Sequence, residues 1–280
     1  MTVPGPPRLL ALDIDGTLLT SDKTVSARTR TALDGARVAG VRLVLVTGRR
    51  LPSARRVARD VGGDVPLIAH NGALVADGPA LLVSLPLPRA LARHAVEIGL
   101  SVGAEPVLHC GAGGEGRVLI RAGARPSPHV RYYLERAAPD VRAVPDLARA
   151  LETEEPMQVM FGGTGPDMAR TRTALAPGLD GPARIERSVY PATGLVILEV
   201  LEKTVAKAAA VAWLQARWGI APEDTLAIGD NWNDREMISA AGVGYLMGNA
   251  DPELRRLGLA VLPTNDDDGV AVAIERHLLD

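Results

Sequence analysis

Short apolar runs in the first 80 residues each end in polar side chains. Leu9–Leu12 is followed by Asp13 and Asp15, and Val41–Val46, rich in valine and leucine, is followed by Thr47. Continuous apolar runs of this length are typical of parallel strands that are covered on both faces. The pattern therefore predicts buried strands whose carboxyl ends lead directly into polar loops.

Apolar residues at helical spacing separate these runs. Ser26–Ala39 has alanine, leucine and valine at helical intervals behind a serine that can cap the first turn, and Gly40 follows as a stop. A second helix is expected at about 52–61, before a strand at Leu67–Ala69. Strands that alternate with helices predict an α/β fold with a doubly wound, Rossmann-like parallel sheet.

The pattern changes between about residues 83 and 189. Prolines become frequent, and the strand-like stretches no longer end in acidic loops; they lie at about 100–108, 117–121 and 157–162. Helices are expected between them, near 88–98, 127–137 and 166–176. We expect an inserted α+β cap domain at 83–189, between two parts of one core, 1–82 and 190–280.

The first pattern returns after residue 190. Strands are expected at Leu195–Val200 and Thr225–Ile228, and the helix between them, Val205–Trp218, stops at Gly219. The second of these strands runs into Gly229 and Asp230, as the strands of the first part run into polar loops. These elements therefore complete the same predicted sheet.

Composition limits the classes of protein to which the chain can belong. Its 280 residues are 47% hydrophobic, the net charge is −2, and the basic residues are spread rather than clustered, so no nucleic-acid partner is predicted. The start, MTVPGPPRLL, lacks the features of an export signal, and no apolar run reaches about 18 residues, so no membrane partner is predicted either. With a single cysteine, Cys110, an internal disulfide is excluded, and we expect a cytoplasmic globular protein.

Reactive side chains follow the predicted strands of both core parts, or begin the helix after one: Asp13 with Asp15, Thr47, Lys207, and Asp230 with Asp234. Ligands bind at this edge of open parallel sheets, so we expect these side chains to converge. Carboxylates brought together from distant segments repel one another unless a cation lies between them. Oxygen ligands suit Mg²⁺, and Lys207 with Thr47 would then contact a phosphoryl group that the metal neutralises.

Six motifs together resemble the haloacid dehalogenase superfamily, and more narrowly its Cof-type phosphatases with a large α/β cap. They are DIDGTL at 13–18, VTGR at 46–49, NGA at 71–73, GDNWND at 229–234, MGNA at 247–250 and DDDGVA at 266–271. Lys207 precedes the fourth motif at the distance that this family shows, although alanine replaces the usual glycine after it. For that reason we prefer Lys207 to the nearby Lys203; these two and Lys23 are the only lysines.

The resemblance implies roles for single residues. Asp13 would be the nucleophile that becomes an aspartyl-phosphate, and Asp15 the general acid and then the base. Thr47 would hold phosphoryl oxygens, while Lys207 would hold both Asp13 and the phosphate. Mg²⁺ would be bound by Asp13, the backbone carbonyl of Asp15, Asp230 and Asp234. The expected substrate-binding set is Thr47, Gly48, Arg49, Asn71, Lys207 and Asn233.

This resemblance implies a phosphatase that hydrolyses small phosphorylated metabolites, such as sugar phosphates or phosphorylated cofactors and their precursors. A phosphosugar mutase on the same scaffold remains an alternative, because its residues would be the same. A phospho-accepting receiver module also combines acidic residues, a threonine and a lysine around Mg²⁺. Such modules have about 120 residues and no inserted cap, and they would leave Asp15 without a function.

Several further residues could contribute to function or only to packing. Gly111, Gly113 and Gly116 spell a dinucleotide fingerprint, but a strand rather than a helix is expected after them, so we interpret them as a cap hairpin. For the adjacent His109 and Cys110 we expect packing rather than metal binding. The remaining candidates are His70 as a substrate contact, Trp232 as either a substrate contact or a local packing residue, and Arg117, Arg121 and Arg131 as ligands for a second anionic group.

Overall fold

The structure is a computed structural model that describes residues 5–279, and its contacts divide the chain into two units. The first unit contains the chain up to Arg49, Ser53–Leu82 and the part from Ala206 onward; the second contains Arg50–Pro52 and Val83–Val205. The second change of unit therefore comes after Val205 and not at residue 190, as the sequence had suggested. The apolar stretch at 195–200 is a strand, but it belongs to the sheet of the inserted unit.

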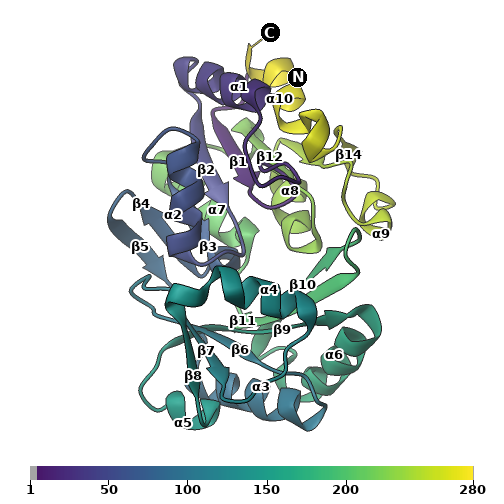
Figure 1. Ribbon diagram of the computed structural model, residues 1–280. Coiled ribbons are helices and arrows are strands. Elements are labelled where there is room, and N and C mark those ends of the chain that lie inside the picture. Colours follow the sequence, from purple (N-terminus) through teal and green to yellow (C-terminus); the bar gives the residue numbers. More distant parts are fainter. Residues whose placement is uncertain (1–4, 280) are drawn as a thin grey trace. The chain divides into compact units, whose positions relative to one another are not determined.

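An eight-stranded sheet forms the centre of the first unit, in the order β14-β13-β12-β1-β2-β3-β4-β5 (Figure 1). Its strands are β1 (Leu9–Asp13), β2 (Arg42–Val46), β3 (Leu67–Ala69), β4 (Leu74–Asp77), β5 (Ala80–Ser84), β12 (Thr225–Gly229), β13 (Val243–Leu246) and β14 (Ala260–Val261). Pairing is parallel from β14 to β3, and β4 runs antiparallel to β3. The neighbours of β1 are β2 and β12, so the strand order reverses at β1, where ligands bind in open sheets.

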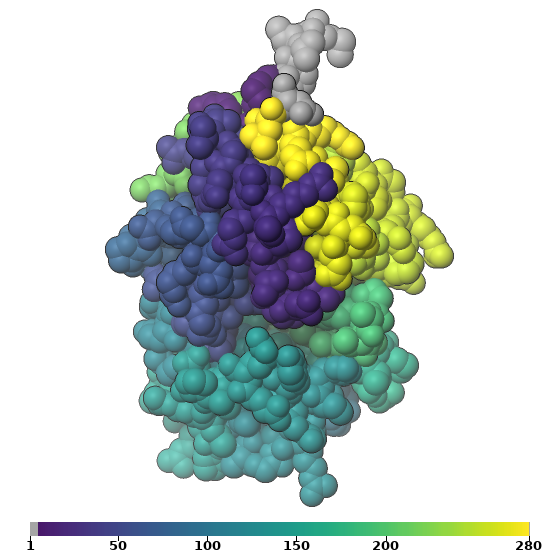
Figure 2. All heavy atoms as spheres, turned by 45° about the horizontal axis from the view of Figure 1, so that its top comes forward, coloured from purple at the N-terminus to yellow at the C-terminus, as the bar shows by residue number. Residues whose placement is uncertain are grey.

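Helices cover both faces of this sheet, as predicted for a doubly wound fold. They are α1 (Ala27–Val38), α2 (Leu51–Asp60), α7 (Lys207–Trp218), α8 (Arg235–Ala240), α9 (Pro252–Arg255) and α10 (Gly269–Ile274). In Figure 1, α2 lies in front of the strands and α7 lies behind them. Helix α1 packs against α10, so the N-terminal and C-terminal parts of the unit lie side by side (Figure 2).

The expected helix signals have the expected contacts. The hydroxyl of Ser26 accepts a hydrogen bond from the backbone N–H of Thr29 at 3.1 Å and so caps α1. Helix α7 ends at Gly219, whose φ of +62° lies in the left-handed region that glycine adopts without strain. None of the helices within residues 5–279 is both long and apolar enough to cross a membrane.

The inserted unit has its own six-stranded sheet, in the order β10-β11-β9-β6-β7-β8. Its strands are β6 (Val107–Cys110), β7 (Arg117–Arg121), β8 (Val141–Val144), β9 (Pro156–Thr164), β10 (Ala183–Tyr190) and β11 (Leu195–Glu202), and its helices are α3 (Arg89–Ser101), α4 (Pro128–Arg136), α5 (Leu147–Ala150) and α6 (Gly165–Leu179). Residues of α3, α5 and α6 pack with the sheet around the buried Phe161. This arrangement is the predicted α+β insertion, although β6 begins later than expected because α3 continues to Ser101.

Three sequence features for which alternatives were open have contacts within the inserted unit. The glycines at 111, 113 and 116 lie in the connection between the antiparallel strands β6 and β7, which confirms the hairpin interpretation. His109 is buried and lies within 2.9 Å of both the Tyr133 hydroxyl and the Gln158 amide nitrogen. Of the three candidate arginines, Arg117 and Arg121 form ion pairs within the unit, with Glu154 and Glu105.

Candidate active site

Side chains from distant parts of the chain meet at the carboxyl edge of the eight-stranded sheet. Asp13 is the last residue of β1 and lies opposite Val46, after which β2 runs into Thr47. On the other side of β1, Gly229 ends β12 and Asp230 follows it. Parallel pairing in register therefore brings these loops to one edge.

A buried ion-pair cluster lies at the centre of this edge. The Lys207 ammonium is 2.6 Å from Asp13 Oδ1 and 2.6 Å from Asp234 Oδ1. The exposed fractions are 2% for Lys207, 5% for Asp13 and 0% for Asp234. Burial opposes the charge on Lys207, but the two carboxylates outweigh it and raise the pKa of its ammonium. Lys207 is thus a fixed positive charge between the two carboxylates.

Three carboxylates lie close enough together to share a cation. Oxygens of Asp13, Asp230 and Asp234 lie within 4.8 Å of one another, and all three residues are buried. Burial raises the pKa of Asp13 to about 7, an effect that Lys207 opposes and Asp234 reinforces. Burial and the neighbouring carboxylates raise the pKa of Asp230 as well. One ammonium does not balance three carboxylates, so this donor set fits a hard divalent cation such as Mg²⁺.

The loop after Asp13 approaches Asp230 very closely. Gly16 has φ of +81°, and a Cβ atom at this position would lie 2.3 Å from Asp230 Oδ2. The hydroxyl of the next residue, Thr17, donates to Asp230 Oδ1 at 3.3 Å. Only glycine allows this approach, which explains the glycine of the DIDGTL motif.

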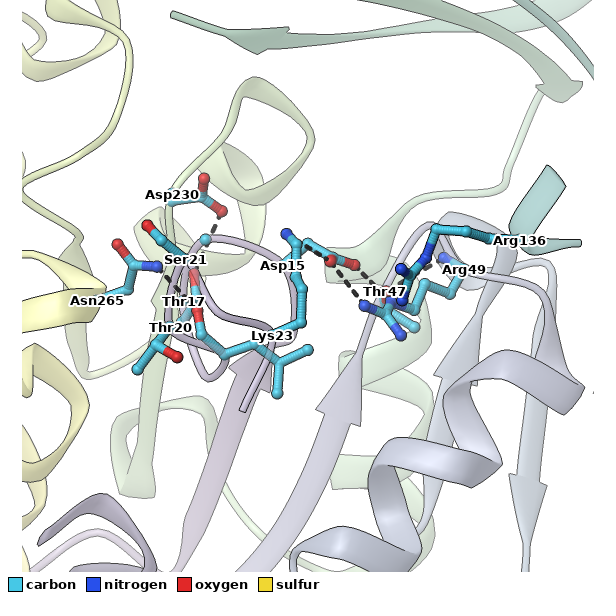
Figure 3. Close-up of polar contacts among 12 residues, drawn as sticks. Asp15, Thr17, Thr20, Ser21, Lys23, Thr47, Arg49, Arg136, Asp230 and Asn265 are labelled. Atoms are coloured by element: carbon cyan, nitrogen blue, oxygen red, sulfur yellow. Dashed lines mark hydrogen bonds and ion pairs between the residues drawn. The ribbon is translucent and has the colours of Figure 1, made fainter. Parts of the chain in front are cut away.

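The side chain of Asp15 does not join the buried carboxylates. It forms a two-point ion pair with the Arg49 guanidinium, at 2.5 Å from Nε and 2.7 Å from the terminal nitrogen (Figure 3). Lys23 Nζ lies 3.6 Å from the same carboxylate, and the Asp15 side chain is 29% exposed. Burial alone would raise the pKa of Asp15, but the contacts with Arg49 and Lys23 outweigh it and lower the pKa. The metal contact expected for this residue was through its backbone carbonyl, not this side chain.

A strained turn connects the other loops of the site. His70 and Asn71 have φ of +49° and +56°, uncommon for residues other than glycine, and Gly72 completes the turn. The backbone N–H of His70 donates to the Arg49 carbonyl, and that of Asn71 donates to the Thr47 carbonyl, both at 3.0 Å. The turn therefore fixes the loop that follows β2.

The same turn reaches the segments that present Asp234 and Lys207. The Asn233 amide donates to Asn71 Oδ1 at 2.8 Å, whereas the buried Asn233 Oδ1 has no partner among residues 5–279. A Cβ atom on Gly72 would lie 2.4 Å from the carbonyl oxygen of Ala206, directly before Lys207. The sequence had suggested His70 as a substrate contact, but it is fully buried within this turn.

Two more expectations concern the acidic loop and the lysines. Asp234 Oδ2 accepts hydrogen bonds from the backbone N–H groups of Asp230 and Asn231, so the loop is folded around its own carboxylate. Trp232 donates to Asp251 at 2.9 Å and packs against the neighbouring apolar cluster, in agreement with the local packing reading. The competing Lys203 is exposed, whereas Lys207 is buried in the site.

Sequence reasoning missed the contact of Lys23 with Asp15. The scarcity of lysine was a usable signal, since two of the three lysines, Lys23 and Lys207, lie beside an aspartate of the Asp-Ile-Asp segment. Thr47 itself is buried, and its hydroxyl accepts a hydrogen bond from the backbone N–H of Arg49 at 3.1 Å.

Known proteins resemble the chain over nearly its whole length. The profile of the family described as haloacid dehalogenase-like hydrolase matches residues 10–274. The stress response protein YhaX of Bacillus subtilis is 28% identical over 96% of this chain and 93% of its own. The 5-amino-6-(5-phospho-D-ribitylamino)uracil phosphatase YwtE of the same organism is 26% identical over 97% of this chain and 98% of its own.

Solved structures agree with this match. A haloacid dehalogenase-like hydrolase from Bacteroides thetaiotaomicron is 26% identical, with a TM-score of 0.78 over 96% of this chain and 99% of its own. A sugar phosphatase of HAD subclass IIB, 20% identical, has a TM-score of 0.77 over 96% of this chain and 98% of its own, and so shares the fold. The matches support a phosphoric monoester hydrolase as the class of enzyme. The chain belongs to the haloacid dehalogenase-like hydrolase family.

Proposed function

We propose that the protein is a Mg²⁺-dependent phosphatase that hydrolyses small phosphomonoesters through an aspartyl-phosphate on Asp13. The proposal rests on one observation: Lys207 lies between the buried carboxylates of Asp13 and Asp234, with Asp230 in the same oxygen cluster. A nucleophilic carboxylate held beside an ammonium can approach a phosphoryl dianion with much of the repulsion removed. Mg²⁺, held by the three aspartates and the Asp15 backbone carbonyl, would supply the remaining positive charge.

The residues divide the first half of the reaction between them. An Asp13 carboxylate oxygen attacks phosphorus while the bond from phosphorus to the ester oxygen breaks on the opposite side. The protonated Asp15 carboxyl donates its proton to the departing ester oxygen, which leaves as an alcohol. Lys207 Nζ and the Thr47 hydroxyl hold phosphoryl oxygens.

In the second half, Asp15 acts in the reverse sense. Its carboxylate takes a proton from a water molecule whose oxygen attacks phosphorus, the bond between Asp13 and phosphorus breaks, and inorganic phosphate leaves. Asp13 is then a carboxylate again and Asp15 is again protonated. Both steps need Asp15 to turn from Arg49 toward the substrate, and a phosphoryl group near Arg49 would compete with Asp15 for the guanidinium.

Phosphorylated sugars, or phosphorylated cofactors and their precursors, are the proposed substrates, and the cytoplasm is the proposed location. Two relatives bear the name of a phosphatase for a phosphorylated ribityl compound and of a sugar phosphatase. Asn233, whose amide nitrogen donates to Asn71 and whose Oδ1 is an acceptor without a partner among residues 5–279, would accept a hydrogen bond from a hydroxyl of such a molecule.

The test is release of inorganic phosphate from a panel of phosphorylated metabolites, measured with Mg²⁺ and with EDTA, by the purified protein and its Asp13→Asn variant. We expect Mg²⁺-dependent release by the native protein and none by the variant. Asp34→Asn, an exposed aspartate on α1, is the matched control and should keep full activity. Release that survives Asp13→Asn would contradict the nucleophile assignment, and movement of phosphate within a sugar bisphosphate would favour the mutase.

A further inference from the structure

Two C-terminal motifs, MGNA at 247–250 and the NDDDG segment at 265–269, have no part in the proposed chemistry. Side chains of both segments hydrogen-bond to residues 14–21, the loop that follows Asp13 and is called the nucleophile loop below. The segments are far apart in the sequence, yet the first and last parts of the chain lie side by side in the first unit (Figure 2). The hydrogen bonds that these two segments make with the nucleophile loop indicate their role.

Asn249 holds the peptide between Gly16 and Thr17. Its side-chain amide donates to the Gly16 carbonyl at 2.8 Å, across 233 positions of sequence. Gly16 is the residue whose backbone lies against Asp230, one of the three clustered carboxylates. A hydrogen bond to the Gly16 carbonyl therefore fixes how closely the nucleophile loop approaches Asp230.

Asn265 holds the same loop through Leu19. Its amide donates to the Leu19 carbonyl at 2.8 Å, and the Leu19 backbone N–H donates to the Ile14 carbonyl at 3.0 Å. Figure 3 shows Asn265 directed toward this loop, beside Thr20 and Ser21. Since Ile14 lies between Asp13 and Asp15, the contact of Asn265 reaches the backbone between the two catalytic carboxylates.

The two asparagines are also connected to each other. The backbone N–H of Asn265 donates to Asn249 Oδ1 at 3.1 Å. The side-chain nitrogen of each asparagine thus donates to the loop that follows Asp13. One hydrogen bond, from the Asn265 backbone, joins the two residues to each other. Displacement of one asparagine would displace the other.

We propose that Asn249 and Asn265 form a clamp that positions the Asp13–Asp15 backbone relative to Asp230, and so sets the geometry for the cation and for the nucleophile. They are positioning residues, because they act through Gly16 and Leu19 and not on the substrate. The inference rests on the proposed function for its kinetic part only, because cation binding can be measured without turnover.

A contact farther along the loop provides a matched control. Asp266, next to Asn265, accepts hydrogen bonds from the backbone N–H and hydroxyl of Ser21 at 2.7 and 2.6 Å, and these contacts are exposed. Asp266→Ala removes a contact between the same two segments without touching the Asp13–Leu19 part of the loop. It should therefore reproduce any purely structural effect of loosening the C-terminal segment.

The experiment compares Asn249→Ala, Asn265→Ala, the double variant and Asp266→Ala. Isothermal titration calorimetry with Mg²⁺ alone measures cation binding, and p-nitrophenyl phosphate hydrolysis gives kcat and KM. We expect each asparagine variant to weaken Mg²⁺ binding and to lower kcat about 10-fold or more, as loss of residues that orient metal ligands does elsewhere. KM should change less than kcat, and the double variant should lose little more than the worse single variant, because the two residues act as one unit.

The outcomes separate the clamp from the proposed activity. If the asparagine variants melt at lower temperature but bind Mg²⁺ and turn over like the native protein, or if Asp266→Ala matches them in every measurement, the clamp is wrong. If a variant does not fold, the other single variant decides the question. If the native protein releases no phosphate from any substrate, the proposed function fails, while Mg²⁺ titration of the same variants still decides whether the clamp exists.

Discussion

The two carboxylates of the Asp-Ile-Asp segment lie two residues apart and have opposite surroundings. Asp13 is buried against the Lys207 ammonium and two other carboxylates, and its pKa is raised to about 7. Asp15 is 29% exposed, and contacts with Arg49 and Lys23 lower its pKa. In a continuing strand, residues 13 and 15 would point to the same face, but β1 ends at Asp13 and the chain turns there, so the two carboxylates are separated.

This difference suits two different tasks. A nucleophile must be held in one position. Burial among ion-pair partners holds Asp13 in place, although it brings carboxylates that repel one another close together. A group that first donates and then accepts a proton must reach both the ester oxygen and water, so a partly exposed ion pair, which is individually weak, leaves it free to move. Each prediction below alters one side of this contrast.

Apart from the complete loss expected of Asp13→Asn, the largest effect is expected from Asp15→Asn, which removes the mobile proton carrier and leaves the buried cluster intact. Hydrolysis of an alkyl phosphate should slow by about 10²–10⁴-fold, the usual contribution of general acid–base catalysis. With p-nitrophenyl phosphate, whose leaving group needs no proton, the first step should survive and give a burst of p-nitrophenolate before slow turnover. Rapid-quench kinetics and Mg²⁺ titration check both parts; loss of Mg²⁺ binding in the variant would contradict the role given to the side chain.

Lys207→Met alters the other side, since it removes the ammonium that lies between the buried carboxylates of Asp13 and Asp234. We expect kcat to fall by about 10²–10³-fold, the effect of losing one preorganised donor at the site of charge development. The free energy of unfolding in EDTA should fall by about 3–5 kcal/mol, because breaking a buried pair leaves uncompensated charge. Denaturant unfolding measures this loss, and Lys203→Met, the exposed lysine four residues earlier, should change neither quantity.

The buried half of this contrast was open to prediction from the sequence, because the features involved are local. Apolar runs that stop at Asp13, Thr47 and Asp230 indicate strands that end at one edge. Parallel pairing of these strands then brings the three side chains together. The clustering of Asp13, Asp230 and Asp234 follows from that edge alone. The choice of Lys207 over Lys203 needed the family spacing, since both precede the acidic loop at similar distances.

The failures involve features that no local pattern records. The stretch at 195–200 has the same apolar texture as the core strands, and only its antiparallel pairing with β9 and β10 places it in the inserted sheet. The pairing of Asp15 with Arg49 joins two residues that the motifs had assigned to separate tasks. The contacts of Asn249 and Asn265 cross more than 230 positions, and an asparagine in a loop gives no indication of which carbonyl it will bind.

Arg49→Met and Lys23→Met each remove one of the two cations that contact the Asp15 carboxylate, so their effects on its pKa can be compared. Loss of either cation should raise the pKa of Asp15 and so extend its action as an acid to higher pH. The limb of the pH–rate profile that falls with rising pH should therefore move upward. The shift should be larger for Arg49→Met, whose guanidinium makes two contacts at 2.5 and 2.7 Å, than for Lys23→Met, whose ammonium is half-exposed and 3.6 Å away. Equal shifts, or a downward shift, would contradict the ion-pair interpretation.

The smallest effect concerns stability without the cation, and its sign follows from Asp13 and Asp230. Their folded pKa values are raised above the unfolded value of 3.8, for Asp13 to about 7. Between these limits the folded state binds more protons than the unfolded state, so stability in EDTA should rise as pH falls from 7 to 5. We expect the free energy of unfolding in EDTA to rise by about 1 kcal/mol, because Lys207 still favours the ionised form. This gain corresponds to an increase of roughly 2–4 °C in melting temperature.

Excess Mg²⁺ should reverse the trend, since it binds the ionised carboxylates and competes with protons. Asp15 works in the opposite sense and only below about pH 4, because its lowered pKa makes its contribution disappear as it becomes protonated. A melting temperature in EDTA that falls between pH 7 and pH 5 would mean that the buried carboxylates are already neutralised by their protein partners, and the case for a cation between them would lose its electrostatic basis.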